Sequence, residues 1–304
     1  MQEYRYAFGQ KQEIGYRWYK PLLTMIIFVL LHLVFSALIL LLAGMIYSSR
    51  NNGSFSEAIE FARLSTYGIT FAEKYSVPWM MIVFGTNIAM IPALTISHKI
   101  IFGKMPGKLL SADKKWRLPV FLKYIISAAI MFTFLHMFTV SHNTQKISAS
   151  ASAGSIILLT AMCFLQCLAE ELVFRGLILQ SCSGWSEFAI FGIAVQAFYF
   201  TIAHLYEIKI SILVFTTAFI WGILCVITDG IEASFSIHYV FNMTYFLPEI
   251  MGYKILDDTD MTFERYMTCM IISVVFVTTE HIMRWLYRKK ERKNIYGQSE
   301  AAGF

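Results

Sequence analysis

Long apolar runs separated by short polar segments make up most of the 304-residue chain. A helix rises about 1.5 Å per residue and the hydrocarbon core of a bilayer is about 30 Å thick, so about 20 apolar residues can cross it. Eight runs approach or exceed this length, over residues 22–47, 79–97, 118–140, 155–180, 185–204, 212–227, 233–250 and 267–287. Their apolar residues are continuous rather than alternating, which favours helices over a transmembrane barrel. The pattern predicts an all-α, polytopic membrane protein of about eight transmembrane helices.

Composition agrees with this pattern, since 57% of the residues are hydrophobic and 15% are charged, against about 25% charged residues in ordinary soluble domains. A helix bundle in a bilayer can remain one unit at this length, so we interpret residues 1–304 as a single membrane domain. The five cysteines lack the paired spacing of a zinc site or a disulfide framework, and we expect buried free thiols. The net charge of +5 is too small to indicate a nucleic-acid partner.

Basic residues gather at both ends of the chain and in one loop. Residues 98–117 contain six lysines and arginines against the single acid Asp113, and such loops are typical of the cytoplasmic side of a membrane. Eight spans place both chain ends on the same side as this loop. We therefore expect cytoplasmic tails over residues 1–20 and 288–304. The Lys-, Ile- and Tyr-rich composition favours a bacterial cell membrane.

Two carboxylates and an arginine interrupt the fourth apolar span. If the span is helical, Glu171 and Arg175 are four residues apart on one face and can form an ion pair. Glu170 points away from that pair and has only Gln166 within reach on its own helix. Charge inside a membrane span is costly unless it is paired or used. We interpret Glu171 and Arg175 as a structural pair and Glu170 as the group that carries the chemistry.

Polar side chains also recur at helical spacing in the fifth and seventh spans. Phe200 and His204 share a face of one helix, and Ser234, His238 and Asn242 share a face of the other. A single histidine near a helix end can be an interfacial or capping residue, and the other set could be interhelical hydrogen bonding. Taken together with the glutamates, however, they supply a base, imidazoles and donors for an oxyanion.

The motifs Glu170-Glu171-x-x-x-Arg175, Phe200-x-x-x-His204 and His238-x-x-x-Asn242 occur in this order on successive apolar segments. They resemble the three motifs of the CPBP (CAAX protease and bacteriocin-processing, or Abi) family of intramembrane proteases, which includes the type II CAAX prenyl endopeptidases. The resemblance extends over residues 155–246 and implies a catalytic core formed by the fourth to seventh helices.

The resemblance also implies roles for individual residues. Glu170 would activate the attacking water, His204 would assist it, and an oxyanion hole would be formed by His238 and Asn242. The site-ordering residues would be Glu171, Arg175 and Phe200. The implied activity is hydrolysis of a peptide bond in a peptide or a lipid-modified protein that reaches the site from the bilayer.

Whether a metal takes part is a separate question. The family has been described as metalloproteases, and Glu170, His204 and His238 could together hold Zn²⁺. The chain has no His-Glu-x-x-His helix, and His238 is paired with Asn242, whose amide is a poor zinc ligand but a good hydrogen-bond donor. We therefore expect a metal-independent glutamate protease, with zinc as the alternative.

Other functions remain open at this stage. Bacteriocin or pheromone maturation, self-immunity and CAAX trimming all agree with the resemblance. The alternatives from other classes are a non-catalytic immunity or scaffold protein that binds a peptide, and a proton-coupled transporter that uses Glu170 and the histidines. Transporters of this kind often have repeated halves with Gly- or Pro-interrupted spans, which this sequence lacks.

The connection between the fourth and fifth spans raises the question of how deep in the membrane His204 lies. Residues 181–186 are rich in Ser and contain Gly184, and we predict a turn there. A straight fifth span of full length would then place His204 near the outer face, far from Glu170. We interpret the fifth helix as short and tilted, with residues 185–191 lying at the membrane interface.

Overall fold

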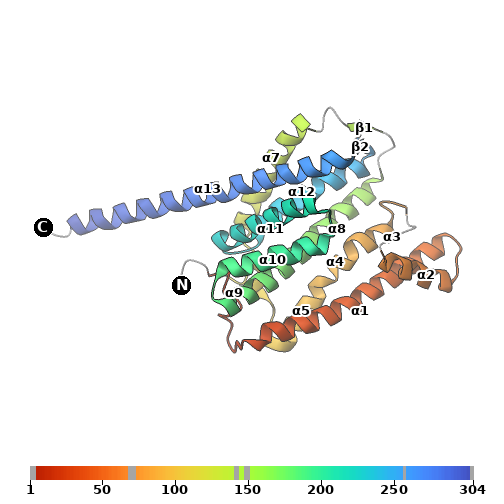
Figure 1. Cartoon of the computed structure of the whole chain (residues 1–304), viewed down its shortest axis with the longest axis horizontal. Coiled ribbons are helices and arrows are strands. Elements are labelled where there is room, and N and C mark those ends of the chain that lie inside the picture. Colours follow the sequence, from red (N-terminus) through yellow and green to blue (C-terminus); the bar gives the residue numbers. More distant parts are fainter. Residues whose placement is uncertain (1–4, 68–72, 140–143, 147–150, 256–257, 302–304) are drawn as a thin grey trace.

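A computed structural model of the chain, which describes residues 5–67, 73–139, 144–146, 151–255 and 258–301, is an almost entirely helical bundle (Figure 1). Within this part of the chain, all eight predicted spans are helical. Six helices are long and apolar enough to cross a membrane, namely Tyr19–Arg50, Val77–Phe102, Leu118–Leu135, Ala153–Ser186, Ile208–Thr228 and Phe263–Tyr287. The apolar helix Ala189–His204 is shorter. The all-α, polytopic fold is therefore confirmed, whereas the number of eight crossings stays a prediction.

The helices of the first half of the chain as far as Phe102 lie on one side of the bundle (Figure 1). Helix α1 (Tyr19–Arg50) packs against α2 (Phe55–Thr66), which begins with a capping box between Ser54 and Glu57. A broken helix follows, consisting of α3 (Val77–Met80), η2 (Met81–Gly85), α4 (Thr86–Ile88) and α5 (Met90–Phe102). The short α6 (Gly107–Leu110) and the long α7 (Leu118–Thr139) complete this half.

The second half carries the three motifs. A continuous helix of 34 residues consists of α8 (Ala153–Glu171), the π-helical η3 (Leu172–Leu179) and α9 (Gln180–Ser186). It is followed by α10 (Ala189–His204), α11 (Ile208–Thr228), α12 (Glu232–Ile250) and α13 (Asp258–Ala301). Two short strands, β1 (Thr144–Lys146) and β2 (Tyr253–Ile255), pair antiparallel at one end of the bundle (Figure 1).

The turn predicted over residues 181–186 is wrong. Helix α9 continues through Gly184 to Ser186, and the chain reverses at Glu187, which has a φ of +67°. The serines do not end the helix because their hydroxyls donate to carbonyl oxygens one turn earlier, Ser181 to Leu177 at 2.6 Å and Ser186 to Cys182 at 2.8 Å. The fifth helix consequently begins at Ala189, four residues later than predicted.

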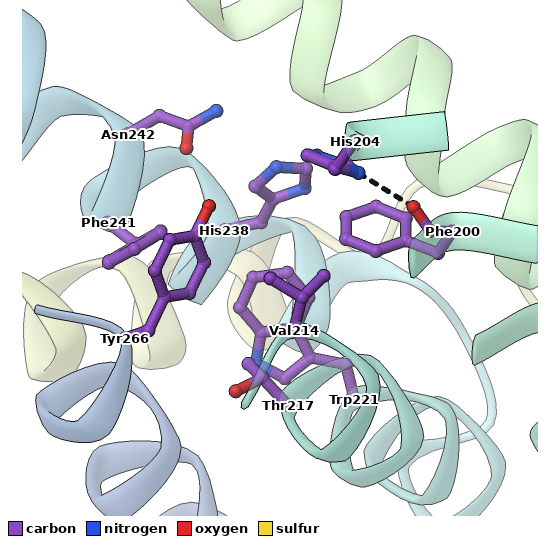
Figure 2. Close-up of a pocket in the computed structure, with 9 residues that line it drawn as sticks. All are labelled: Phe200, His204, Val214, Thr217, Trp221, His238, Phe241, Asn242 and Tyr266. Carbon is purple, nitrogen blue, oxygen red and sulfur yellow. Dashed lines mark hydrogen bonds between the residues drawn. The ribbon is translucent and has the colours of Figure 1, made fainter. Parts of the chain in front are cut away.

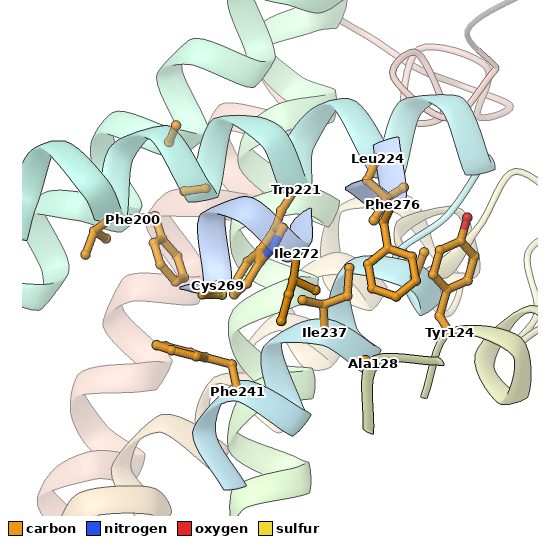
Figure 3. Packing of buried hydrophobic residues seen from close by; sticks show 14 of the residues in the cluster. Tyr124, Ala128, Phe200, Trp221, Leu224, Ile237, Phe241, Cys269, Ile272 and Phe276 are labelled. Carbon is orange, nitrogen blue, oxygen red and sulfur yellow. The ribbon is translucent and has the colours of Figure 1, made fainter. Parts of the chain in front are cut away.

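The largest hydrophobic core lies between α7, α10, α11, α12 and α13 (Figure 3). Aromatic residues from three of these helices, Phe200, Trp221 and Phe241, form its centre, with Ile237 and Ile272 beside them. The five cysteines are free and buried, as expected. This packed core fixes the rotation of α10, α11 and α12, and therefore the direction in which their polar side chains point.

The segment before α1 is also part of the folded bundle. Tyr6 and Gln10 are fully buried; the Tyr6 hydroxyl donates to the carbonyl of Leu109 at 2.8 Å, and the Gln10 amide donates to the carbonyl of Leu177 at 3.1 Å. Within the predicted tail over residues 1–20, Tyr6 and Gln10 are thus packed against α6 and η3. Its cytoplasmic location stays a prediction.

Candidate active site

A helical hairpin brings the end of α10 to the depth of the glutamate pair. Helix α10 packs against α9 and η3. The chain reverses at residues 187–188. Glu171 precedes Glu187 by 16 residues, and His204 follows Phe188 by 16 residues. Helices of equal residue number have similar lengths, so His204 lies level with the two glutamates. The fifth helix is short, with 16 residues, as predicted, whereas its tilt and the interfacial position of residues 185–191 stay predictions.

The same geometry positions α11 against α12. The chain reverses at residues 229–230, with Asp229 in a left-handed conformation at a φ of +59°. Trp221 lies eight residues before this reversal and His238 lies eight residues after it. Their ring centroids are 5.0 Å apart. Trp221 is in turn fixed by its indole N–H, which donates to Ser273 of α13 at 2.8 Å.

The predicted ion pair between Glu171 and Arg175 is confirmed. Oε1 of Glu171 lies 3.1 Å from Nη1 of Arg175, and both side chains are fully buried. The guanidinium group lies outside hydrogen-bonding geometry to any described acceptor. It stacks instead on two rings, with its Cζ 4.4 Å from the centre of Phe200 and 5.3 Å from that of Trp221. Cation–π contacts of this kind stabilise a desolvated arginine, and they explain why a phenylalanine occupies the second motif.

Glu171 also holds the third motif in place. Its carboxylate accepts hydrogen bonds from Ser234 at 2.6 Å and from Nδ1 of His238 at 3.0 Å. An ionised carboxylate can only accept, so the proton of a neutral His238 is on Nδ1. Its Nε2 is then left with a lone pair. Glu171 therefore sets both the orientation and the tautomer of His238.

Glu170 faces the other side of the same histidine. One of its carboxylate oxygens, Oε1, accepts a hydrogen bond from the amide of Gln166, the partner predicted from helical spacing. Oε2 is buried without a hydrogen-bond partner among the described residues and lies 3.5 Å from Nε2 of His238. This approach of His238 to Glu170 agrees with the predicted convergence of the first and third motifs. The imidazole of His238 thus lies between the buried carboxylates of Glu170 and Glu171, which are adjacent residues of α8.

A small cavity is lined by His204, His238 and Asn242, together with aromatic residues (Figure 2). Its volume is about 20 Å³, enough for one water molecule. Figure 2 shows the rings of His204 and His238 next to each other, with Phe200 on one side and Asn242 on the other. The structure therefore brings His204, His238, Asn242 and Phe200 together. Glu170 lies behind His238 and is not among the lining residues.

Hydrogen bonds also fix the side chains of His204 and Asn242. Nδ1 of His204 donates to the carbonyl of Phe200 at 2.7 Å, so a neutral His204 also has its lone pair on Nε2. The amide of Asn242 donates to Oε1 of Gln166 at 3.3 Å. Gln166 therefore connects Asn242 with Glu170, and this connection between the first and third motifs is not visible in the sequence.

Four lining residues come from outside the motifs. Val214, Thr217 and Trp221 lie on α11, and Tyr266 lies on α13. Sequence analysis missed them because an aromatic or a threonine in an apolar span looks the same whether it faces the core or a cavity. Across the described residues, no three His, Cys, Asp or Glu side chains are grouped closely enough to hold a metal ion. The predicted independence from metal is not tested by this observation.

The fold and the site define a polytopic, helical membrane protein with buried carboxylates and imidazoles arranged around an internal cavity. Residues 151–244 match the family of Rce1-like type II CAAX prenyl endopeptidases. The match contains all three motifs and spans nearly the same residues as the predicted core over 155–246. The family resemblance is therefore confirmed.

Neither the curated proteins nor the solved structures contain a match to the chain. The family supports CAAX-type intramembrane protease activity in general terms, and with it a multi-pass membrane protein whose substrate is a peptide or a prenylated protein.

Proposed function

We propose that the protein is an intramembrane endopeptidase in which Glu170 activates a water molecule for attack on a peptide bond. One observation carries this proposal. The buried Oε2 of Glu170 has no described hydrogen-bond partner and lies 3.5 Å from Nε2 of His238. Both atoms are acceptors when His238 is neutral, and burying two facing acceptors is unfavourable unless a donor joins them. A water molecule beside both atoms would donate one proton to each and be oriented for deprotonation.

The reaction follows from these positions. Glu170 takes a proton from the water, and the water oxygen forms a bond to the carbonyl carbon of the substrate. Asn242 donates from its amide to the resulting oxyanion, and His238 does so from Nε2 when it carries a second proton. The C–N bond then breaks as the proton held by Glu170 passes to the leaving nitrogen. The products are an amine and a carboxylic acid, which then loses its remaining proton to solvent, and His204, with its free Nε2, assists the proton movement.

Replacement of Glu170 by Gln tests the proposal. The substitution keeps the shape of the side chain but removes the base, so cleavage of a prenylated CAAX-type peptide should fall by at least about a thousandfold. The measurement is the rate of peptide cleavage by purified protein in lipid vesicles, together with the thermal unfolding midpoint. Glu187→Gln is the matched control because Glu187 is exposed and pairs with Lys11 away from the site. An unimpaired Glu170→Gln variant would refute the assignment.

Three further measurements separate the competing hypotheses. A peptide-binding immunity or scaffold protein would keep its binding and its protective effect after Glu170→Gln. A zinc enzyme would lose activity on exhaustive chelation and regain it with added zinc, whereas we expect activity to persist. CAAX trimming and the maturation of a bacterial peptide would be distinguished by comparing membranes that contain wild type or Glu170→Gln for one accumulated precursor.

A further inference from the structure

Gln166, a buried residue of α8, contacts both the proposed base and the proposed oxyanion donor. It is 7% exposed and is not among the residues that line the catalytic cavity. Its amide nitrogen donates to Oε1 of Glu170, one turn later on the same helix, and its carbonyl oxygen accepts from Nδ2 of Asn242 on α12 at 3.3 Å. Gln166 therefore joins a residue of the first motif to a residue of the third, although it belongs to none of the three motifs.

The amide group of Gln166 gives this connection a direction. An ionised carboxylate can only accept hydrogen bonds, so the nitrogen of Gln166 must face an ionised Glu170, and its oxygen must then face Asn242. An amide oxygen can also only accept, so Asn242 must turn its own nitrogen toward Gln166. An ionised Glu170 thus sets the orientation of the Asn242 amide through one intervening side chain.

The two hydrogens of the Asn242 nitrogen have acceptors of unequal strength. One faces the carbonyl oxygen of Gln166, and the nitrogen also lies 3.3 Å from Sγ of Cys167, which is a weak acceptor. The second hydrogen is therefore available to a stronger acceptor, such as the oxyanion of a substrate. If Gln166 did not hold it, the amide could rotate and present its carbonyl oxygen in place of the nitrogen, and that oxygen would repel an oxyanion.

We propose that Gln166 is a positioning residue that links Glu170 to Asn242 and holds the Asn242 amide in the orientation that an oxyanion donor requires. This inference rests on the proposed peptidase function and adds a residue to it. Donors that are oriented before the reaction stabilise the transition state more than the bound substrate. The effect of Gln166 should therefore appear in kcat, while KM stays nearly the same.

Gln166→Met tests this role, because methionine has a similar length but lacks the amide. In lipid vesicles, kcat for a prenylated CAAX-type peptide should fall about ten- to a hundredfold, with KM within about twofold of wild type. If this variant does not fold, Gln166→Asn makes the same test, since its amide is too short to reach both partners. Gln10→Met is the matched control and should keep the wild-type kcat. Gln10 is fully buried, and its amide donates to Leu177 and Ser181 at 3.1 Å each, neither of which lines the cavity.

A double-mutant cycle separates positioning from a general loss of stability. Asn242→Ala removes the group that Gln166 orients, so adding Gln166→Met to it should lower kcat by less than about threefold further. Effects of the two substitutions that multiply would overturn the inference, and so would a Gln166→Met variant with the kcat of wild type. In both cases a wild type that cleaves and a Glu170→Gln variant that does not would leave the peptidase proposal standing. A wild type without cleavage would contradict the peptidase proposal and this inference together.

Discussion

At the scale of single residues, Glu171 has the largest number of partners in the site. It pairs with Arg175, accepts from Ser234 and fixes Nδ1 of His238. Among the described residues, Glu170, its neighbour, has Gln166 as its one hydrogen-bond partner and keeps one oxygen without a partner. Adjacent positions in one helix therefore have different surroundings. Glu171 joins side chains of η3 and α12, whereas Glu170 keeps the free oxygen that the proposed base requires.

Glu171→Ala should lose both activity and stability. The substitution leaves Arg175 as a buried, unpaired cation and releases His238, and breaking a buried pair in this way costs about 3–5 kcal/mol. The measurements are the free energy of unfolding and the rate of peptide cleavage. Glu60→Ala is the control, since Glu60 forms a comparable pair with Arg63, at 2.6 Å, on the surface, where ion pairs contribute little. Equal effects of the two substitutions would contradict this account.

At the scale of elements, the length and close packing of α10 determine where the second motif lies. Gly192 faces α9 and η3, and a Cβ atom placed on it would come within 2.3 Å of the carbonyl oxygen of Leu179 and 2.1 Å of the Ser183 hydroxyl. The absence of a side chain at this position lets the two helices approach. The π-helical η3, which widens the helix directly after the glutamate pair, lies in the same contact.

Gly192→Ala should therefore push α10 away from η3. We expect a loss of about 1–3 kcal/mol in the free energy of unfolding, as for other overpacked sites, and a fall in cleavage rate because His204 moves with its helix. Gly154→Ala is the control, because the nearest atom to its Cβ lies at 3.8 Å and alanine favours a helix over glycine. A Gly192→Ala variant as stable and active as Gly154→Ala would show that this contact does not position the site.

At the scale of the whole molecule, segments far from the motifs complete the structure that supports them. The N-terminal segment packs against α6 and η3, and Arg117, in the loop between α6 and α7, binds Glu232 at the start of α12 with three hydrogen bonds of 2.9, 2.9 and 2.5 Å. The beginning of the chain is thus joined to the helix that carries His238. The far end of α13, by contrast, extends past the rest of the bundle (Figure 1).

Tyr6→Phe should destabilise the folded protein by about 1 kcal/mol, because the carbonyl of Leu109 then loses its donor in a buried setting. Thermal unfolding in detergent measures the effect. Tyr67→Phe is the control, since this side chain is 72% exposed. If the two variants unfold alike, the N-terminal segment contributes less to the folded bundle than its burial indicates.

The sequence by itself determined the features that depend on residues close together in the chain. Apolar runs of sufficient length gave the helices, and helical spacing gave the pairing of Glu171 with Arg175 and the contact of Gln166 with Glu170. The turn predicted over residues 181–186 was wrong. The helix continues there, and its serine hydroxyls donate to carbonyl oxygens of the same helix. The sequence also left the cavity-lining role of Trp221 and Tyr266 unassigned, because an aromatic side chain looks the same in the sequence whether it faces the core or a cavity.

The tertiary structure decided how the motifs meet. Periodicity tells which residues share a face of one helix, but not the depth or the rotation at which two helices pack. The reversals at residues 187–188 and 229–230 set those depths, and so placed His204 level with the glutamates and His238 between them. Side-chain packing of the central core set the rotations. These distances join residues more than 30 positions apart, and only the packed bundle determines them.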